Sequence, residues 1–111
     1  MSEKKEQNKS TQSDIYVVGI GASAGGLEAL QELISHLPKD LKDIAIVIAQ
    51  HLSPTYKSML VQLLSRQTKL EVVEIKNGMM IRANRIYITP PDSEITLSGG
   101  YFNLAKPANS A

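Results

Sequence analysis

The sequence predicts an α/β fold, a three-layer αβα arrangement with a Rossmann-like, mostly parallel sheet and a C-terminal β-hairpin. Two continuous apolar runs, at residues 15–20 and 44–49, are rich in β-branched residues, as buried parallel strands are. Each run is followed by a turn and then by apolar residues at helical spacing. Strands and helices that alternate in this order indicate parallel strands joined by right-handed crossovers.

The two predicted helices each carry one apolar face. The first has leucine and isoleucine at three- and four-residue spacing from Leu27 to Leu37, and Pro38 ends it. His36 falls at its end, where a partial positive charge suits the helix dipole. The second helix follows Pro54, which the first turn of a helix tolerates, and it precedes the remaining strands.

The second half of the chain contains only predicted strands. A third strand is expected over 70–75, and a fourth over 85–89 is stopped by Pro90-Pro91. Residues 94–97 and 101–104 flank a turn that contains two glycines, and this pattern predicts the hairpin. Met79-Met80 is read as core or turn rather than as a cofactor feature.

Composition limits both the domain organisation and the function. Residues 1–13 are almost entirely polar and predict a disordered tail, 14–105 a single partial domain, and 106–111 an unstructured end. The tail has no apolar signal-peptide region and the chain has no cysteine, so a cytoplasmic location is expected. A net charge of +1, no tryptophan and one phenylalanine argue against nucleic-acid binding. No metal and no cofactor are expected.

The glycine-rich turn from Gly19 to Gly26 carries the chemistry. Its pattern Gly19-x-Gly21-x-x-Ala24 fits the loose dinucleotide-binding signature, but no acidic residue follows the second strand to bind a ribose. A phosphate loop of the Gly-Lys-Ser/Thr type is absent as well. The remaining interpretation is that the turn presents a nucleophile.

A serine and a histidine follow the first two predicted strands. Ser23 lies after the first strand and His51 after the second, so neighbouring parallel strands would bring them to the same edge of the sheet. The histidine would then take the proton of the serine, and helix N–H groups would face a developing oxyanion. The structural alternatives are that Ser23 only caps the helix and that His51 is an ordinary loop residue.

These segments resemble the CheB-type protein-glutamate methylesterase domain. The shared motifs are G-A-S-[TA]-G-G, a following L-P, and a strand that ends in Q-H, with later N-G-M, I-Y-I-T-P-P and E-I-T-L segments. Here the first three are residues 21–26, Leu37-Pro38 and Gln50-His51. The pairs Ser23-Ala24, His51-Leu52 and Pro90-Pro91 are most similar to the branch found in CheB/CheR fusion proteins. The resemblance spans residues 15–104, which is the N-terminal part of that domain.

The resemblance implies hydrolysis of γ-glutamyl methyl esters, and in some members glutamine deamidation, on the cytoplasmic helices of chemoreceptors in bacterial chemotaxis. It assigns Ser23 as the nucleophile and His51 as the general base and acid. The backbone N–H of Ala24 becomes the oxyanion-hole candidate. The family's triad aspartate comes from a later glycine-rich motif that no residue of this sequence matches. Asp92 and Glu94 follow the fourth strand without fitting it.

Three functions therefore stay open. The first is a methylesterase domain of weak or no activity by itself, because loss of the aspartate costs about 10⁴ in kcat in well-studied triads. The second is a non-catalytic module that binds a receptor or another partner. The third is a nucleotide-binding half-domain.

Uncovered sheet edges also predict self-association.

Overall fold

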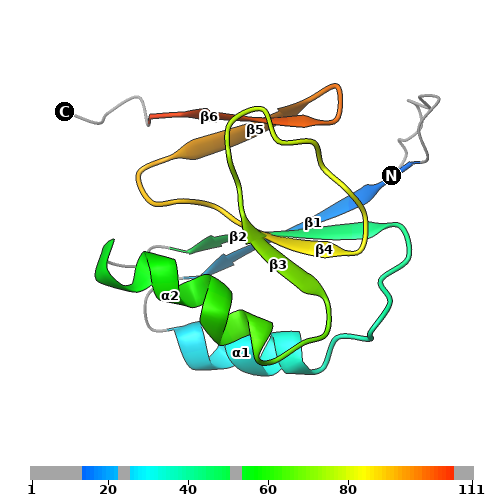
Figure 1. Ribbon diagram of the computed structural model, residues 1–111, viewed down its shortest axis with the longest axis vertical. Helices are drawn as coiled ribbons and strands as arrows, with labels where there is room; N and C mark the ends of the chain where they lie inside the picture. Colours follow the sequence, from blue (N-terminus) through cyan, green and yellow to red (C-terminus); the bar gives the residue numbers. More distant parts are fainter. Residues whose placement is uncertain (1–13, 23–25, 51–53, 107–111) are drawn as a thin grey trace.

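The computed structural model describes residues 14–22, 26–50 and 54–106. Its elements follow one another in the predicted order, two strand–helix units and then four further strands (Figure 1). The helices are α1 (Leu27–Ser35) and α2 (Pro54–Ser65). The strands are β1 (Tyr16–Ala22), β2 (Ile44–Gln50), β3 (Glu71–Glu74), β4 (Arg85–Ile88), β5 (Glu94–Ser98) and β6 (Tyr101–Ala105).

The main sheet has four strands in the order β1-β2-β4-β3, and every neighbouring pair is parallel. The predicted adjacency of the first two strands is confirmed over their whole length, from Tyr16 opposite Ile44 to Ala22 opposite Gln50. Strands β5 and β6 form the predicted antiparallel hairpin, with Ser98 opposite Tyr101 across its turn. Gly99 and Gly100 have φ values of +60° and +87°, the two left-handed positions of a tight hairpin turn.

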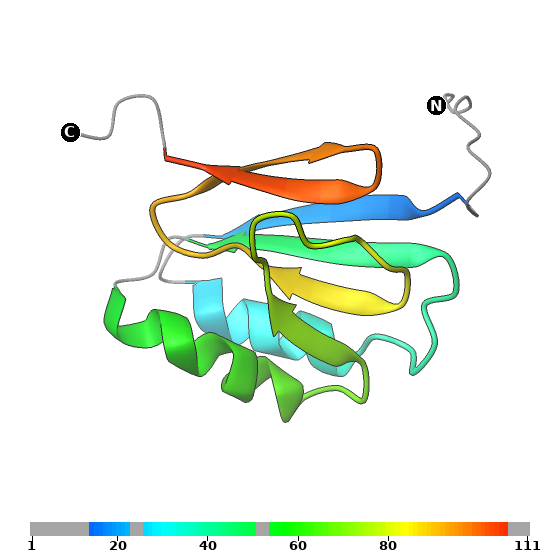
Figure 2. The same ribbon diagram turned by 45° about the horizontal axis from the view of Figure 1, so that its top comes forward.

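Both helices lie on one face of the main sheet, and the hairpin lies on the other (Figures 1 and 2). The cause is the position of β4 between β2 and β3. The chain moves outward from β1 to β3 through α1 and α2 and then turns back to β4. Because right-handed crossovers place outward and returning connections on opposite faces, the return from β3 to β4 passes over the far face. The α/β class is confirmed, and in the described residues the third layer is a hairpin in place of further helices.

Alternating side chains divide the core into two clusters. On the helix face, isoleucines of β2 and β4 pack against leucines and isoleucine of α1 and α2. On the hairpin face the buried cluster consists of Ala45, Val47, Ile75, Ile81, Tyr87 and Phe102. Successive strand residues point to opposite faces, so each central strand contributes to both clusters.

Backbone bonds attach the hairpin to the connection between β3 and β4. Gly78 N donates to Phe102 O over 2.8 Å, Phe102 N donates to Met79 O over 2.8 Å, and Ile81 N donates to Gly100 O over 2.8 Å. Met79 packs against the hairpin-face cluster, while Met80 is largely exposed and pairs with Tyr101. The interpretation as core is confirmed for Met79, whereas Met80 is an exposed residue of a β-bridge and lies neither in the core nor in a turn.

Strand β1 forms an edge of the described sheet. Tyr16, Val17 and Val18 are 58%, 44% and 44% exposed, although consecutive residues of a strand point to opposite faces. Both faces of this edge strand are therefore partly open in the part of the chain that the structure describes. The prediction of a parallel strand is confirmed here, but the prediction that this strand is buried is wrong for the described residues. By contrast, Ile46, Val47 and Ile48 of β2 are all buried.

Candidate functional site

The candidate site lies at the carboxyl edge of the parallel sheet, where β1, β2 and β4 end. The last residues of β1 and β2, Ala22 and Gln50, are Cα partners in the register. Neighbouring strands lie about 4.8 Å apart, so the two chain segments that leave this edge start side by side. In open α/β sheets, ligands bind at this edge.

The predicted site residues Ser23, Ala24 and His51 lie outside the described residues. What the structure supplies is the position of their neighbours in the chain. Ser23 directly follows Ala22, and His51 directly follows Gln50. The three-residue segments 23–25 and 51–53 each connect a strand end to the first turn of a helix.

The amino end of α1 faces this edge. Its N-cap residue is Gly26, and among the described residues no side-chain hydrogen bond caps the helix. Glu28 is the acidic residue of the first turn. A helix leaves its first N–H groups without intrahelical partners, so an uncapped N-terminus can face a negative charge. The cap position lies three residues beyond Ser23 in the sequence.

The glycines of the dinucleotide pattern lie inside β1 rather than in the turn. Gly19 pairs with Val47 and Gly21 with Ala49 in the parallel register, and neither has a positive φ. Among the described residues, a Cβ built at Gly19 meets nothing within 4 Å, and one at Gly21 approaches Ala49 O at 4.0 Å. The backbone does not require glycine at either position, nor does the packing against the described part of the chain. The tight turn that the dinucleotide signature needs is therefore not formed by these two residues.

Thr89 adds a polar group at the same edge that the sequence analysis did not identify. Its backbone N–H donates to Ile48 O over 2.8 Å, which fixes it beside the end of β2. Its Oγ1 is buried and has no hydrogen-bond partner among residues 14–22, 26–50 and 54–106. A buried hydroxyl without a partner costs free energy. One feature of the sequence could have pointed to Thr89. It is the last residue of the strand predicted over 85–89, directly before Pro90-Pro91, so it belongs to the carboxyl edge of the sheet.

Two kinds of feature are absent from the described residues. Among residues 14–22, 26–50 and 54–106, no group of three or more His, Cys, Asp or Glu side chains is arranged to hold a metal ion. No described helix is both long and apolar enough to cross a membrane. The other histidine, His36, is the C-cap of α1, with its Nδ1 2.8 Å from Glu32 O. Its interpretation as a helix-end residue is confirmed.

Comparison with known proteins gives one consistent result. The family model described as CheB methylesterase matches residues 18–110. A protein-glutamate methylesterase/protein-glutamine glutaminase of Hydrogenovibrio crunogenus is 31% identical over 112 residues, covering 96% of this chain and 29% of the relative. The protein of the same name from Salmonella typhi is 30% identical over 90 residues, covering 79% of this chain and 25% of the relative.

The comparison of the fold with solved structures agrees with the comparison of the sequence. The crystal structure of the CheB methylesterase catalytic domain of Thermotoga maritima superimposes with a TM-score of 0.74 at 31% identity, covering 85% of this chain and 51% of that one. The chain thus spans about half of that catalytic domain and 29% of the Hydrogenovibrio relative. Because the family match and the fold match both cover most of its residues, the chain belongs to the CheB methylesterase family.

Proposed function

We propose that this chain carries the serine and histidine of a protein-glutamate methylesterase site. Ser23 attacks the carbonyl carbon of a γ-glutamyl methyl ester, and His51 accepts its proton. The same imidazole then protonates the departing methanol, and water hydrolyses the acyl-enzyme by the reverse roles. The relatives are also named glutaminases, so the proposed site acts on a glutamine side chain by the same steps with ammonia as the leaving group.

The observation that carries the proposal is the pairing of Ala22 with Gln50. It supports a common origin, at one sheet edge, for the two segments that begin with Ser23 and His51. The N-terminus of α1, which begins at Leu27, supports the oxyanion role of the Ala24 N–H, because a helix N-terminus favours negative charge. Membership of the CheB methylesterase family supplies the class of ester.

The protein substrate in this proposal is a chemoreceptor. The proposal also includes a low rate of ester hydrolysis for this chain. No residue of the sequence matches the late aspartate motif of the family. A histidine without its orienting carboxylate loses about 10⁴ in kcat in well-studied triads. The proposed function therefore assigns Ser23 and His51 the bond-making steps and expects turnover to be slow.

The test is methanol release from a peptide that contains a glutamate γ-methyl ester. We expect slow release that Ser23→Ala and His51→Ala each abolish. Ser98→Ala and His36→Ala are the matched controls, because Ser98 ends strand β5 and His36 ends helix α1. Release that persists unchanged in Ser23→Ala would contradict the proposal.

A further inference from the structure

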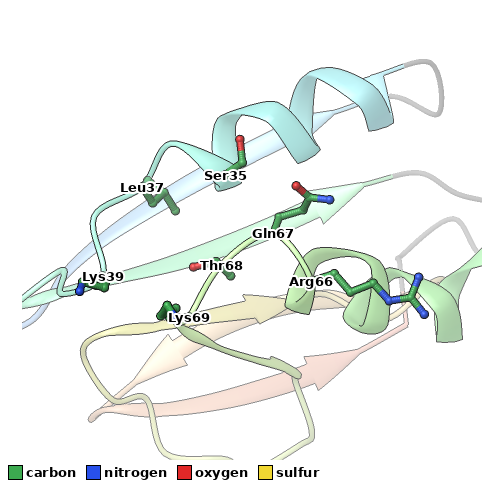
Figure 3. Close-up of a pocket in the computed structure, with 7 residues that line it drawn as sticks. All are labelled: Ser35, Leu37, Lys39, Arg66, Gln67, Thr68 and Lys69. Carbon is green, nitrogen blue, oxygen red and sulfur yellow. The ribbon is translucent and has the colours of Figure 1, made fainter.

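A hollow with a volume of about 380 Å³ lies between the carboxyl ends of α1 and α2. The helices run antiparallel to the strands, so this hollow lies at the amino edge of the sheet, opposite the candidate site. Ser35 contributes from the end of α1, and residues 66–69 contribute from the turn after α2 (Figure 3). Strand β2 has seven residues, so the two edges are roughly 23 Å apart.

Positive charge is concentrated around this hollow. Lys39, Arg66 and Lys69 line it, and no aspartate or glutamate is among the lining residues. Figure 3 shows Lys39 and Lys69 toward one end and Arg66 at the other. Over the whole chain the balance is only +1, from 12 Lys and Arg against 11 Asp and Glu. Three cations around one hollow are therefore a local feature and not a reflection of overall charge.

Neither ion pairs nor helix dipoles account for this charge. Within the residues that the structure describes, none of the three cations has a carboxylate oxygen within ion-pair distance. Two helix carboxyl ends contribute about half a negative charge each, so they balance about one of the three cations. A net charge of about +2 therefore remains around the hollow, and the field of this charge attracts an anion.

The neutral groups between the cations can also donate hydrogen bonds. Thr68 Oγ1 accepts from Leu70 N over 3.0 Å, which leaves the hydroxyl proton for another acceptor. Gln67 is held by its backbone bond to Leu64 O at 2.9 Å, and its amide lines the hollow. Ser35 Oγ donates to Glu32 O over 2.7 Å, so its hydroxyl proton is already used. Two hydrogen bonds thus hold the turn after α2.

We propose that this hollow binds a carboxylate side chain of an acidic protein segment. The three cations are exposed and the hollow is open, which fits a side chain from another protein surface, whereas small-molecule sites enclose most of their ligand. The inference rests on the proposed function, because the substrate of a protein-glutamate methylesterase is a protein that carries glutamates. The hollow holds the substrate protein at the amino edge of the sheet, while the methyl ester reaches the candidate site at the carboxyl edge.

The test is the binding of a fluorescent glutamate-rich peptide to the full chain, measured by anisotropy at fixed ionic strength. The variant Lys39→Gln, Arg66→Gln, Lys69→Gln removes the cations. The control Lys76→Gln, Arg82→Gln, Lys106→Gln removes the same charge from exposed positions that do not line the hollow. Circular dichroism confirms that both variants fold.

We expect the first variant to raise Kd about tenfold, the combined effect of three exposed charge contacts. The control should change Kd less than about twofold, because screened charges away from the contact contribute little. A peptide with glutamine in place of glutamate should not bind. Equal weakening in both variants, absence of binding, or specific displacement by inorganic phosphate would each overturn the proposal. Ser23→Ala should bind normally, so the result is independent of the proposed chemistry.

Discussion

Phe102→Ala tests whether the hairpin and the main sheet form one cooperative unit. The Phe102 side chain has no exposed surface and lies in the hairpin-face cluster. Its ring centroid is 5.0 Å from that of Tyr87, with an angle of 52° between the planes. Tyr87 in turn is 1% exposed and belongs to the central strand β4. The substitution therefore removes the hairpin's buried side chain from the cluster that joins the two sheets.

The expected loss follows from this burial. Truncating a fully buried phenylalanine to alanine costs about 3–5 kcal/mol, of which the ring pair with Tyr87 supplies about 1 kcal/mol. A domain of this size is stable by about 5–15 kcal/mol. With a urea slope of about 2 kcal/mol per M, a loss of 4 kcal/mol lowers the midpoint by about 2 M.

The assay is urea unfolding followed by circular dichroism, with Asn103→Ala as the matched control. Asn103 is the next residue of β6 and is exposed. An exposed substitution of this kind should change stability by less than about 0.5 kcal/mol. If Phe102→Ala moved the midpoint no further than Asn103→Ala, the hairpin would contribute nothing to the stability of the sheet. That result would refute the packing described here.

Three further predictions concern single positions. Thr89→Val should stabilise the fold by about 1 kcal/mol, because it removes a buried hydroxyl that has no partner in the described part of the chain; a lower thermal midpoint would mean that this hydroxyl is bonded. Asn84→Ala should cost about 1 kcal/mol more than Asn84→Gly in urea unfolding. Both lose the bond from Leu41 N, but only alanine strains the φ of +69°. Val18→Lys should reduce self-association through the β1 edge, seen by sedimentation velocity; a wild-type chain that stays monomeric at high concentration would contradict it.

Most elements could be predicted from local patterns. The apolar run before the glycine turn and the run at 44–49 became neighbouring parallel strands. The run at 44–49 is buried on both faces, as continuous β-branched residues favour, whereas the first run forms an exposed edge strand. The hairpin followed from two short strands around Gly99-Gly100, since this turn needs two positive φ values. These signals lie within a few residues of the elements that they predict.

The position of β4 could not be predicted in this way. Strand order depends on contacts between Ile46 and Ile86 and between Val72 and Ile86, which are far apart in the sequence. That order decides that both helices cover one face and the hairpin the other. Phe102, the lone phenylalanine, gave no local sign that it would fill the space under Tyr87.

The candidate site was predicted in part. The adjacency of the strands that precede Ser23 and His51 is confirmed, whereas the roles of these two residues stay predictions. Thr89 was missed because a hydroxyl at a strand end has no distinctive spacing. The basic hollow was missed because Lys39 and Lys69 come together only through the packing of α1 beside α2.

The most direct test of the central claim is labelling with a fluorophosphonate, followed by peptide mapping. The reagent reacts once with an activated serine and needs no turnover, so a slow site is still detected. We predict a covalent adduct on Ser23 that is lost in His51→Ala and retained in His36→Ala. An adduct on another serine, no adduct on Ser23, or labelling of Ser23 that His51→Ala leaves unchanged would contradict the account.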